Sequence, residues 1–212
     1  MKGQDIIFRE AQKGMGFLPN SLKEMAKKPN ILGSFSMLFA NIKGFSSSNT
    51  TMWSGLKITL NNLRWTINAK KNRAQEVPAY LKDLVALVSS NAAGCRYCQA
   101  HTAHTAHGNG VSIEKLQSVW EFETSKLFSA KEKAALSFAL AAGSTPNQVS
   151  ASHHQTLKTH FSEPQIIEIM ATIAIFGFLN RWNDSLATRL EEEPLRFAQE
   201  HLTERWEAGK HQ

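Results

Sequence analysis

The two cysteines of the chain, Cys95 and Cys98, stand two residues apart, and His101 follows the second by three residues. At this spacing two thiols can close a disulfide within one helical turn, so the pair can cycle between reduced and oxidised forms. On one helix the positions i, i+3 and i+6 share a face. The thiolate is the reactive form of cysteine, and a helix N-terminus or a nearby His favours it. The spacing therefore predicts a redox-active dithiol.

Other uses of these residue types fit the sequence less well. A structural zinc site needs four ligands, and the chain has only one C-x-x-C motif. A c-type haem motif needs His directly after the second cysteine, where this chain has Gln99. A metal held by Cys98 with His101, His104 and His107 stays open, as does a pair of inert buried thiols. A redox pair needs neither a metal nor an organic cofactor, and we expect none.

Composition and charge narrow the class of protein. The 212 residues carry a net charge of +6 that is scattered along the chain, so we expect no nucleic-acid partner. The most apolar stretch, Ile166–Leu179, contains Glu168 and is shorter than the ~20 residues of a membrane span. The first residues lack an apolar signal region. We therefore expect no membrane association and a cytoplasmic location, where a C-x-x-C pair is more often catalytic or metal-binding than structural.

Helical spacing recurs along the whole sequence, and strand signals are weak, so we predict an all-α fold. Gly94 suits a left-handed turn just before the cysteine helix, and Ser129 with Glu132 fits a capping box. We expect helices at 52–72, from Pro78, at 95–107, from 129 and at 194–208. We expect a single all-α domain, made of an N-terminal helical extension (1–77), a C-x-x-C hairpin (78–110) and a C-terminal helical half (111–212).

The stretch from Asp83 to His101 resembles the carboxymuconolactone decarboxylase superfamily, in its alkylhydroperoxidase D-like, peroxidase-related branch. That branch has an acidic residue twelve positions before the first cysteine and a His three or four positions after the second. The resemblance is specific over about residues 78–110, and extends more loosely to Gly16–Asn20 and to Phe178–Asp184. It implies an all-α fold with the C-x-x-C motif at the N-terminus of a core helix, usually in symmetric oligomers.

The same resemblance implies roles for four residues. Cys98 is the thiol that attacks a hydroperoxide, Cys95 resolves the product as a disulfide, and His101 helps to remove the Cys98 proton. Asp83 stands where the family typically has Glu, one methylene longer, and we expect its carboxylate to face Cys98 and His101 as part of the proton relay. His104 is a second candidate for the imidazole. The implied function is a thiol-dependent peroxidase that reduces hydroperoxides and is restored by a dithiol protein or small-molecule reductant.

Two other functions stay open at this point. One is a carboxymuconolactone decarboxylase-like lactone enzyme, although its chemistry does not need the cysteine pair. The other is a non-catalytic redox-sensing helical oligomer. In each case we expect a homo-oligomer, a dimer, trimer or hexamer, with the segment 52–72 as its contact. Arg181 and Asp184, three residues apart, are interpreted as a structural ion pair, with a substrate anchor as the alternative.

Overall fold

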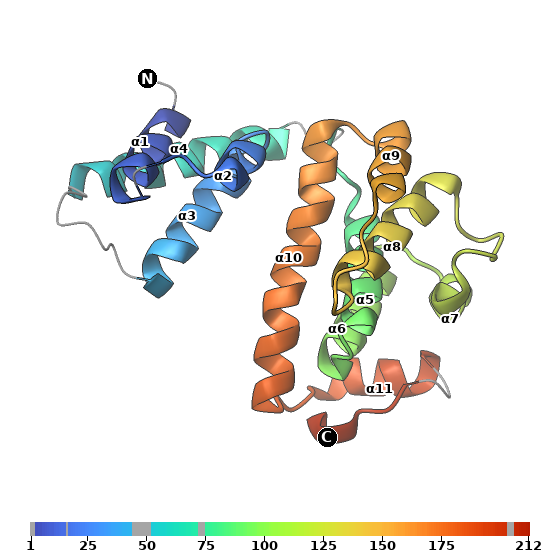
Figure 1. The fold of residues 1–212 in the computed structure, drawn as a ribbon. Helices are drawn as coiled ribbons and strands as arrows, with labels where there is room; N and C mark the ends of the chain where they lie inside the picture. The colour runs from blue at the N-terminus through green and yellow to red at the C-terminus, as the bar shows by residue number, and fades with distance from the viewer. Residues whose placement is uncertain (1–2, 16, 44–51, 72–74, 203–205) are drawn as a thin grey trace. The chain divides into compact units, whose positions relative to one another are not determined.

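The structure is a computed structural model that describes residues 3–15, 17–43, 52–71, 75–202 and 206–212 (Figure 1). Over these residues the chain forms helices and connecting turns, without a strand, which confirms the all-α prediction. The α-helices are α1 (Gly3–Met15), α2 (Asn20–Met25), α3 (Pro29–Lys43), α4 (Met52–Lys71), α5 (Ala79–Ala92), α6 (Arg96–Gly108), α7 (Ile113–Gln117), α8 (Ala130–Gly143), α9 (Ala151–His160), α10 (Glu163–Leu186) and α11 (Glu192–His201). Two 3-10 helices, η2 (Val119–Glu121) and η4 (Gly209–His211), complete the described elements.

The helices group into two compact units. The first comprises residues 1–76 and 163–168, and the second comprises residues 77–162 and 169–212. We propose that both units belong to one domain, since a single helix, α10, contributes to each.

The first unit is built around a small apolar cluster that joins α1, α2, α3 and α4. Its charged centre is Lys28, whose Nζ lies 3.1 Å from Glu76 Oε1 and 2.8 Å from Glu168 Oε2. This pairing attaches the start of α10 to the N-terminal helices. The buried members of the apolar cluster are Ile6, Ile7, Leu22, Leu32 and Ile58.

The second unit contains the cysteine motif and is centred on α5. This helix packs against α6 on one side and α8 on another, while α9 covers α8 and α11 lies against α6 (Figure 1). At the end of α8, a Cβ on Gly143 would stand 2.7 Å from Ser89 O, so a larger residue would force the two helices apart. The buried apolar side chains of α5 are Leu81, Leu84, Val85, Ala86, Leu87 and Val88.

The ends of several helices follow from local sequence signals. Ser129 and Glu132 form the predicted capping box: Ser129 N donates to Glu132 Oε2 at 2.8 Å, and Glu132 N donates to Ser129 Oγ at 3.3 Å. Two features differ from expectation. The structure adds α1, and it ends α11 at His201 rather than at residue 208. Among the described helices, none combines the length and the apolar character needed to cross a membrane.

Candidate functional site

The turn before the cysteine helix ends α5 and begins α6 within three residues. Gly94 has φ +78°, the left-handed conformation that glycine adopts at little cost. Gly94 N donates to Asn91 O at 3.0 Å and Cys95 N donates to Ser90 O at 3.1 Å, which is the double hydrogen bond of a Schellman motif. The backbone N–H of Cys95 thus closes α5, while its side chain faces the first turn of α6.

Cys95 is the N-cap residue of α6, and its sulfur accepts a hydrogen bond from Cys98 N at 3.4 Å. Both thiols are free and buried, with exposed fractions of 0% for Cys95 and 3% for Cys98. The cysteines therefore stand at the N-terminal end of one helix, with the first sulfur against the backbone of the second residue. This confirms the predicted position at the start of the helix, and that the two sulfurs can bridge stays a prediction.

The two thiols have opposite pKa shifts. The pKa of Cys95 is lowered, chiefly because the Cys98 thiol donates a hydrogen bond to it, and backbone N–H groups of Cys98 and Tyr97 add to the effect against the cost of burial. The pKa of Cys98 is raised, because its proton is held in the hydrogen bond to Cys95, because the thiol is buried, and because the Cys95 charge is close. Of the two thiols, Cys95 therefore loses its proton more readily, and Cys98 less readily, than an ordinary cysteine.

Residues from the C-terminal part of the chain surround this pair. Asn183 Nδ2 lies 3.7 Å from Cys98 Sγ, and this contact opposes the rise in the Cys98 pKa. Asp184 acts in the other direction, since its negative charge disfavours a thiolate on either cysteine. Lys210 Nζ lies 2.8 Å from Asp184 Oδ2, and its positive charge partly offsets that of the carboxylate. Trp206 Nε1 donates to Arg96 O at 3.3 Å, so the last residues pack over the start of α6.

His101 has a carboxylate partner, but it is not the one that we expected. His101 Nε2 lies 2.7 Å from Glu191 Oε2, and Tyr97 Oη donates to Glu191 Oε1 at 3.1 Å. The rings of Tyr97 and His101 lie 4.4 Å apart between centroids, tilted by 32° to each other. Burial favours the neutral acid, yet hydrogen bonds from its own backbone, His101 and Tyr97 together lower the pKa of Glu191. Burial, followed by the Glu191 contact, raises the pKa of Tyr97 to about 12.

Asp83 lies at the other end of the cysteine helix. Its Oδ2 accepts a hydrogen bond from Asn109 Nδ2 at 2.6 Å, and Thr105 also donates to it. Burial outweighs these contacts and raises the pKa of Asp83. Since Thr105 follows Cys98 by seven residues, about 10 Å along a helix, these hydrogen-bond partners of Asp83 are about two turns or more beyond the thiol. The carboxylate of the His101 pair is therefore Glu191 and not Asp83.

The remaining histidines of α6 pack against α11. The rings of His104 and His107 each lie 5.4 Å from the ring of Phe197. His107 Nδ1 also lies 3.0 Å from Val111 O. Within the part of the chain that the structure describes, no three His, Cys, Asp or Glu side chains are grouped closely enough to hold a metal ion.

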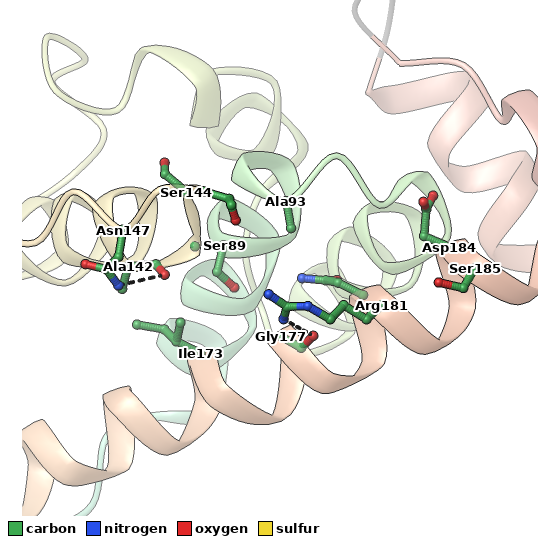
Figure 2. Close-up of a pocket in the computed structure, with 13 residues that line it drawn as sticks. Ser89, Ala93, Ala142, Ser144, Asn147, Ile173, Gly177, Arg181, Asp184 and Ser185 are labelled. Carbon is green, nitrogen blue, oxygen red and sulfur yellow. Dashed lines mark hydrogen bonds between the residues drawn. The ribbon is translucent and has the colours of Figure 1, made fainter.

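A cleft of about 460 Å³ adjoins the cysteine turn (Figure 2). The cleft lies among α10 and the C-terminal ends of α5 and α8, and Arg181 Nη1 donates to Gly177 O along its α10 wall at 3.1 Å. Asp184 also lines the cleft but pairs with Lys210 and not with Arg181, so the expected Arg181–Asp184 ion pair is wrong. Neither the cleft nor Glu191 carries a local sequence signal, because the chain brings their residues together from separate helices.

Comparisons with known proteins agree with the fold and the motif. The sequence profile of the carboxymuconolactone decarboxylase family matches residues 56–141, which include both cysteines. The chain is also similar to the uncharacterized protein YnjA of Escherichia coli (strain K12). The two are 24% identical over 165 residues, which cover 78% of this chain and 91% of the relative.

Three solved structures are similar over most of their own length. The debrominase Bmp8 is 31% identical with a TM-score of 0.58, covering 93% of this chain and 90% of the debrominase. A cysteine-to-alanine variant of that debrominase has been solved in complex with 2,3,4-tribromopyrrole. It is 33% identical with a TM-score of 0.57, covering 92% of this chain and 88% of the variant. A protein of unknown function from Agrobacterium tumefaciens shares the fold at 18% identity and a TM-score of 0.53, covering 63% of this chain and 90% of that protein.

Proposed function

The chain belongs to the carboxymuconolactone decarboxylase family, and we propose that it is a thiol-disulfide oxidoreductase whose cysteine pair reduces its substrate by two electrons. The observation that supports this most directly is the hydrogen bond from Cys98 N to Cys95 Sγ at 3.4 Å. It places one sulfur at a helix N-terminus, where a thiolate is favoured. The second thiol stands beside it and can complete a disulfide.

For a hydroperoxide substrate, the Cys95 thiolate attacks the terminal oxygen. An S–O bond forms, the O–O bond breaks, and the leaving alkoxide takes a proton to become an alcohol. Cys95 is then a sulfenic acid. The Cys98 sulfur attacks the oxidised sulfur, an S–S bond forms, and the oxygen leaves as water with the Cys98 proton. A dithiol reductant restores the pair by exchange, so each cycle carries two electrons to one peroxide.

This proposal exchanges the roles that the resemblance implies for the two cysteines. The pKa directions favour Cys95 as the thiolate and leave Cys98 protonated. Only a thiolate is a competent nucleophile at the first step. Cys98 must lose its proton at the second step, when the charge on Cys95 has gone and no longer opposes ionisation. The Asn183 contact then supports the Cys98 thiolate.

His101 is placed to act at that second step. It follows Cys98 by three residues, so both side chains project from one face of α6. Glu191 holds the imidazole in place, with its Oε2 2.7 Å from Nε2. We infer that the Glu191–His101 pair accepts the Cys98 proton through water, as a general base, and returns it to the oxygen that leaves as water.

A second candidate substrate is a halogenated aromatic ring, and the similarity to the debrominase favours it. In that reaction the thiolate attacks bromine on the ring. An S–Br bond forms, the C–Br bond breaks, and the ring carbon takes a proton. The second thiol then displaces bromide and forms the disulfide while releasing its proton. The same two thiols thus supply the two electrons, and the products are the debrominated ring, bromide and a disulfide.

One experiment tests the chemistry and separates the substrates. Reduced protein is mixed in stopped flow with tert-butyl hydroperoxide or with 2,3,4-tribromopyrrole, and free thiols are titrated over time. We expect one oxidant equivalent to consume both thiols of the chain. Cys95→Ser should abolish the reaction, and Cys98→Ser should stop it at a sulfenic acid that a dimedone probe captures.

The outcomes bear on each function in turn. Thiols that stay reduced with both compounds would contradict the oxidoreductase. Oxidation that does not recycle with dithiothreitol would favour the redox sensor over the enzyme. Turnover of a carboxylated lactone by the Cys95→Ser variant would favour the decarboxylase-like alternative, since that chemistry does not need the thiols.

A further inference from the structure

We propose that the cleft beside the cysteine turn binds a small organic anion, a carboxylate on a compact apolar body. We further propose that this carboxylate is the part of the substrate by which the enzyme holds it. The second statement rests on the proposed oxidoreductase function, and the first does not. The volume of about 460 Å³ lies within the ordinary range for small-molecule sites.

The cation of the cleft is Arg181, and its charge is available to a ligand. Figure 2 shows its side chain lying back along α10 toward Gly177, with Ser89 facing the same space from α5. Within the described residues, its only hydrogen bond is the one that Nη1 donates to Gly177 O at 3.1 Å. A guanidinium has five N–H donors in a planar fork, which matches the geometry of a carboxylate. Most of this fork therefore remains for an anion.

The local charge also favours an anion. Asp184 is the acidic residue that lines the cleft, and Lys210 Nζ lies 2.8 Å from its Oδ2. His211 Nε2 lies 3.5 Å from its other oxygen. Since Asp184 is engaged in this way, the charge of Arg181 is not neutralised within the cleft.

A second donor comes from Asn180, one residue before the arginine. Its side chain lines the cleft and is only 4% exposed, yet Oδ1 is buried without a hydrogen-bond partner among the described residues. Buried amides are nearly always paired in native proteins. Oδ1 can only accept a hydrogen bond, so the group that Asn180 can offer to an anion is the N–H of its Nδ2. The hydroxyls of Ser89 and Ser144 already donate to Ala86 O and Leu140 O. The arginine and the amide are therefore the main donors for a ligand, with the hydroxyls of Thr145 and Ser185 beside them in the lining.

The apolar part of the cleft defines the rest of the ligand. Carbon surface from Ala93, Ala142, Ile173 and Gly177 lines it between the polar groups. Ala93 is two residues before Cys95, and Asp184 acts electrostatically on both thiols. An anion held by Arg181 would thus direct its apolar body toward the cysteine turn.

The binding test uses benzoate as the probe and benzamide as its neutral match, with affinities measured by NMR titration of the reduced protein. We expect benzoate to bind, and benzamide to bind at least about tenfold more weakly, since a charge-assisted hydrogen bond contributes about that factor. Arg181→Gln should weaken benzoate binding by a similar factor, with Arg181→Lys intermediate. Arg196→Gln, at α11 and outside the cleft lining, is the matched control and should bind as the wild type does.

A second measurement asks whether the ligand is the substrate. Benzoate should slow the oxidation of the thiols by tert-butyl hydroperoxide in the wild type, but not in Arg181→Gln. Equal binding of benzoate and benzamide, or unchanged binding in Arg181→Gln, would overturn the anion site. Binding without protection of the thiols would overturn the substrate role alone. Arg181-dependent binding by a protein whose thiols do not react would leave the site standing while the proposed function fails.

Discussion

At the scale of single residues, the two thiols differ in how readily they lose a proton, and this difference decides which sulfur reacts first. Cys95 accepts hydrogen bonds from the first turn of α6, whereas Cys98 keeps its proton and gives a hydrogen bond. The two cysteines therefore have different chemistry although they occupy one helical turn.

Replacing the second thiol tests this asymmetry. In Cys98→Ala, Cys95 loses its strongest hydrogen-bond donor, so we expect the pKa of Cys95 to rise. Its alkylation by iodoacetamide should then begin at higher pH than in the wild type. Cys98→Ser retains a donor and should stay closer to the wild type. The same pH profile in all three proteins would show that the thiol contact does not set the pKa of Cys95.

A second prediction at this scale concerns Glu191, the carboxylate that contacts His101. Glu191→Gln keeps the shape of the side chain but removes its charge, so we expect thiol oxidation by hydroperoxide to slow by roughly tenfold, the scale of general acid–base assistance. The pKa of Glu191 is lowered, so the difference should be present at neutral pH and vanish as the pH falls through that pKa.

Two variants control this measurement. Glu193→Gln, at a neighbouring exposed residue of α11, should behave as the wild type. Asp83→Asn should also leave the rate unchanged, because Asp83 pairs with Asn109. A slow Asp83→Asn and a normal Glu191→Gln would restore the pairing that we expected from the sequence.

At the scale of elements, the site depends on the turn between α5 and α6. Adding a side chain to Gly94 meets no steric obstacle, since no atom lies within 4 Å of the position that a Cβ would occupy, but φ +78° is unfavourable for any L-residue. We expect Gly94→Ala to lower the free energy of unfolding by about 1 kcal/mol. Gly108→Ala, inside α6 and equally unobstructed, should raise it by roughly 0.5–1 kcal/mol.

Urea unfolding followed by circular dichroism measures both changes. The two substitutions add the same methyl group, so any difference between them reports backbone conformation. Equal shifts in the same direction would contradict the role assigned to Gly94.

The elements that the sequence predicts are those with local signals. The Gly94 turn, the Ser129 capping box and the start of the cysteine helix each depend on residues within one or two turns of one another, and the structure has all three. Helix α1 lacks such a signal, because neither a Pro nor a capping residue marks its start. Glu191 lacks one as well, because it follows His101 by 90 residues and only packing of the second unit brings the two together.

At the scale of the whole molecule, α3 and α4 expose more apolar surface than a solvated helix pair requires. The exposed side chains recur at intervals of three and four residues along each helix, the spacing of a helix-packing seam. Four-helix bundles form when two such pairs bury their seams against each other. The exposed residues are Phe35, Leu38, Phe39 and Ile42 on α3, and Leu56, Leu60, Leu63 and Ile67 on α4.

We therefore expect a homo-oligomer in which a second copy of the chain covers this face. Light scattering at micromolar concentration should give a multiple of the 23.6 kDa chain mass. The double substitution Leu60→Glu and Leu63→Glu should shift the mass toward that of one chain, because it places charges in the seam. Leu127→Glu, at an exposed leucine of the second unit, should leave the mass unchanged. A single-chain mass for the wild type would defeat the prediction.

The hydrogen bond from Cys98 N to Cys95 Sγ also makes the protein a reporter of its own oxidation. While the first sulfur is a thiolate, it is a good acceptor and should protect the Cys98 amide hydrogen from exchange with deuterium. Once that sulfur is bonded to its neighbour, it loses its charge and accepts poorly. The exchange rate of this one amide, followed by NMR, should therefore rise with oxidation while the amides in the middle of α5 stay protected. Such a signal would read the redox state without any added dye.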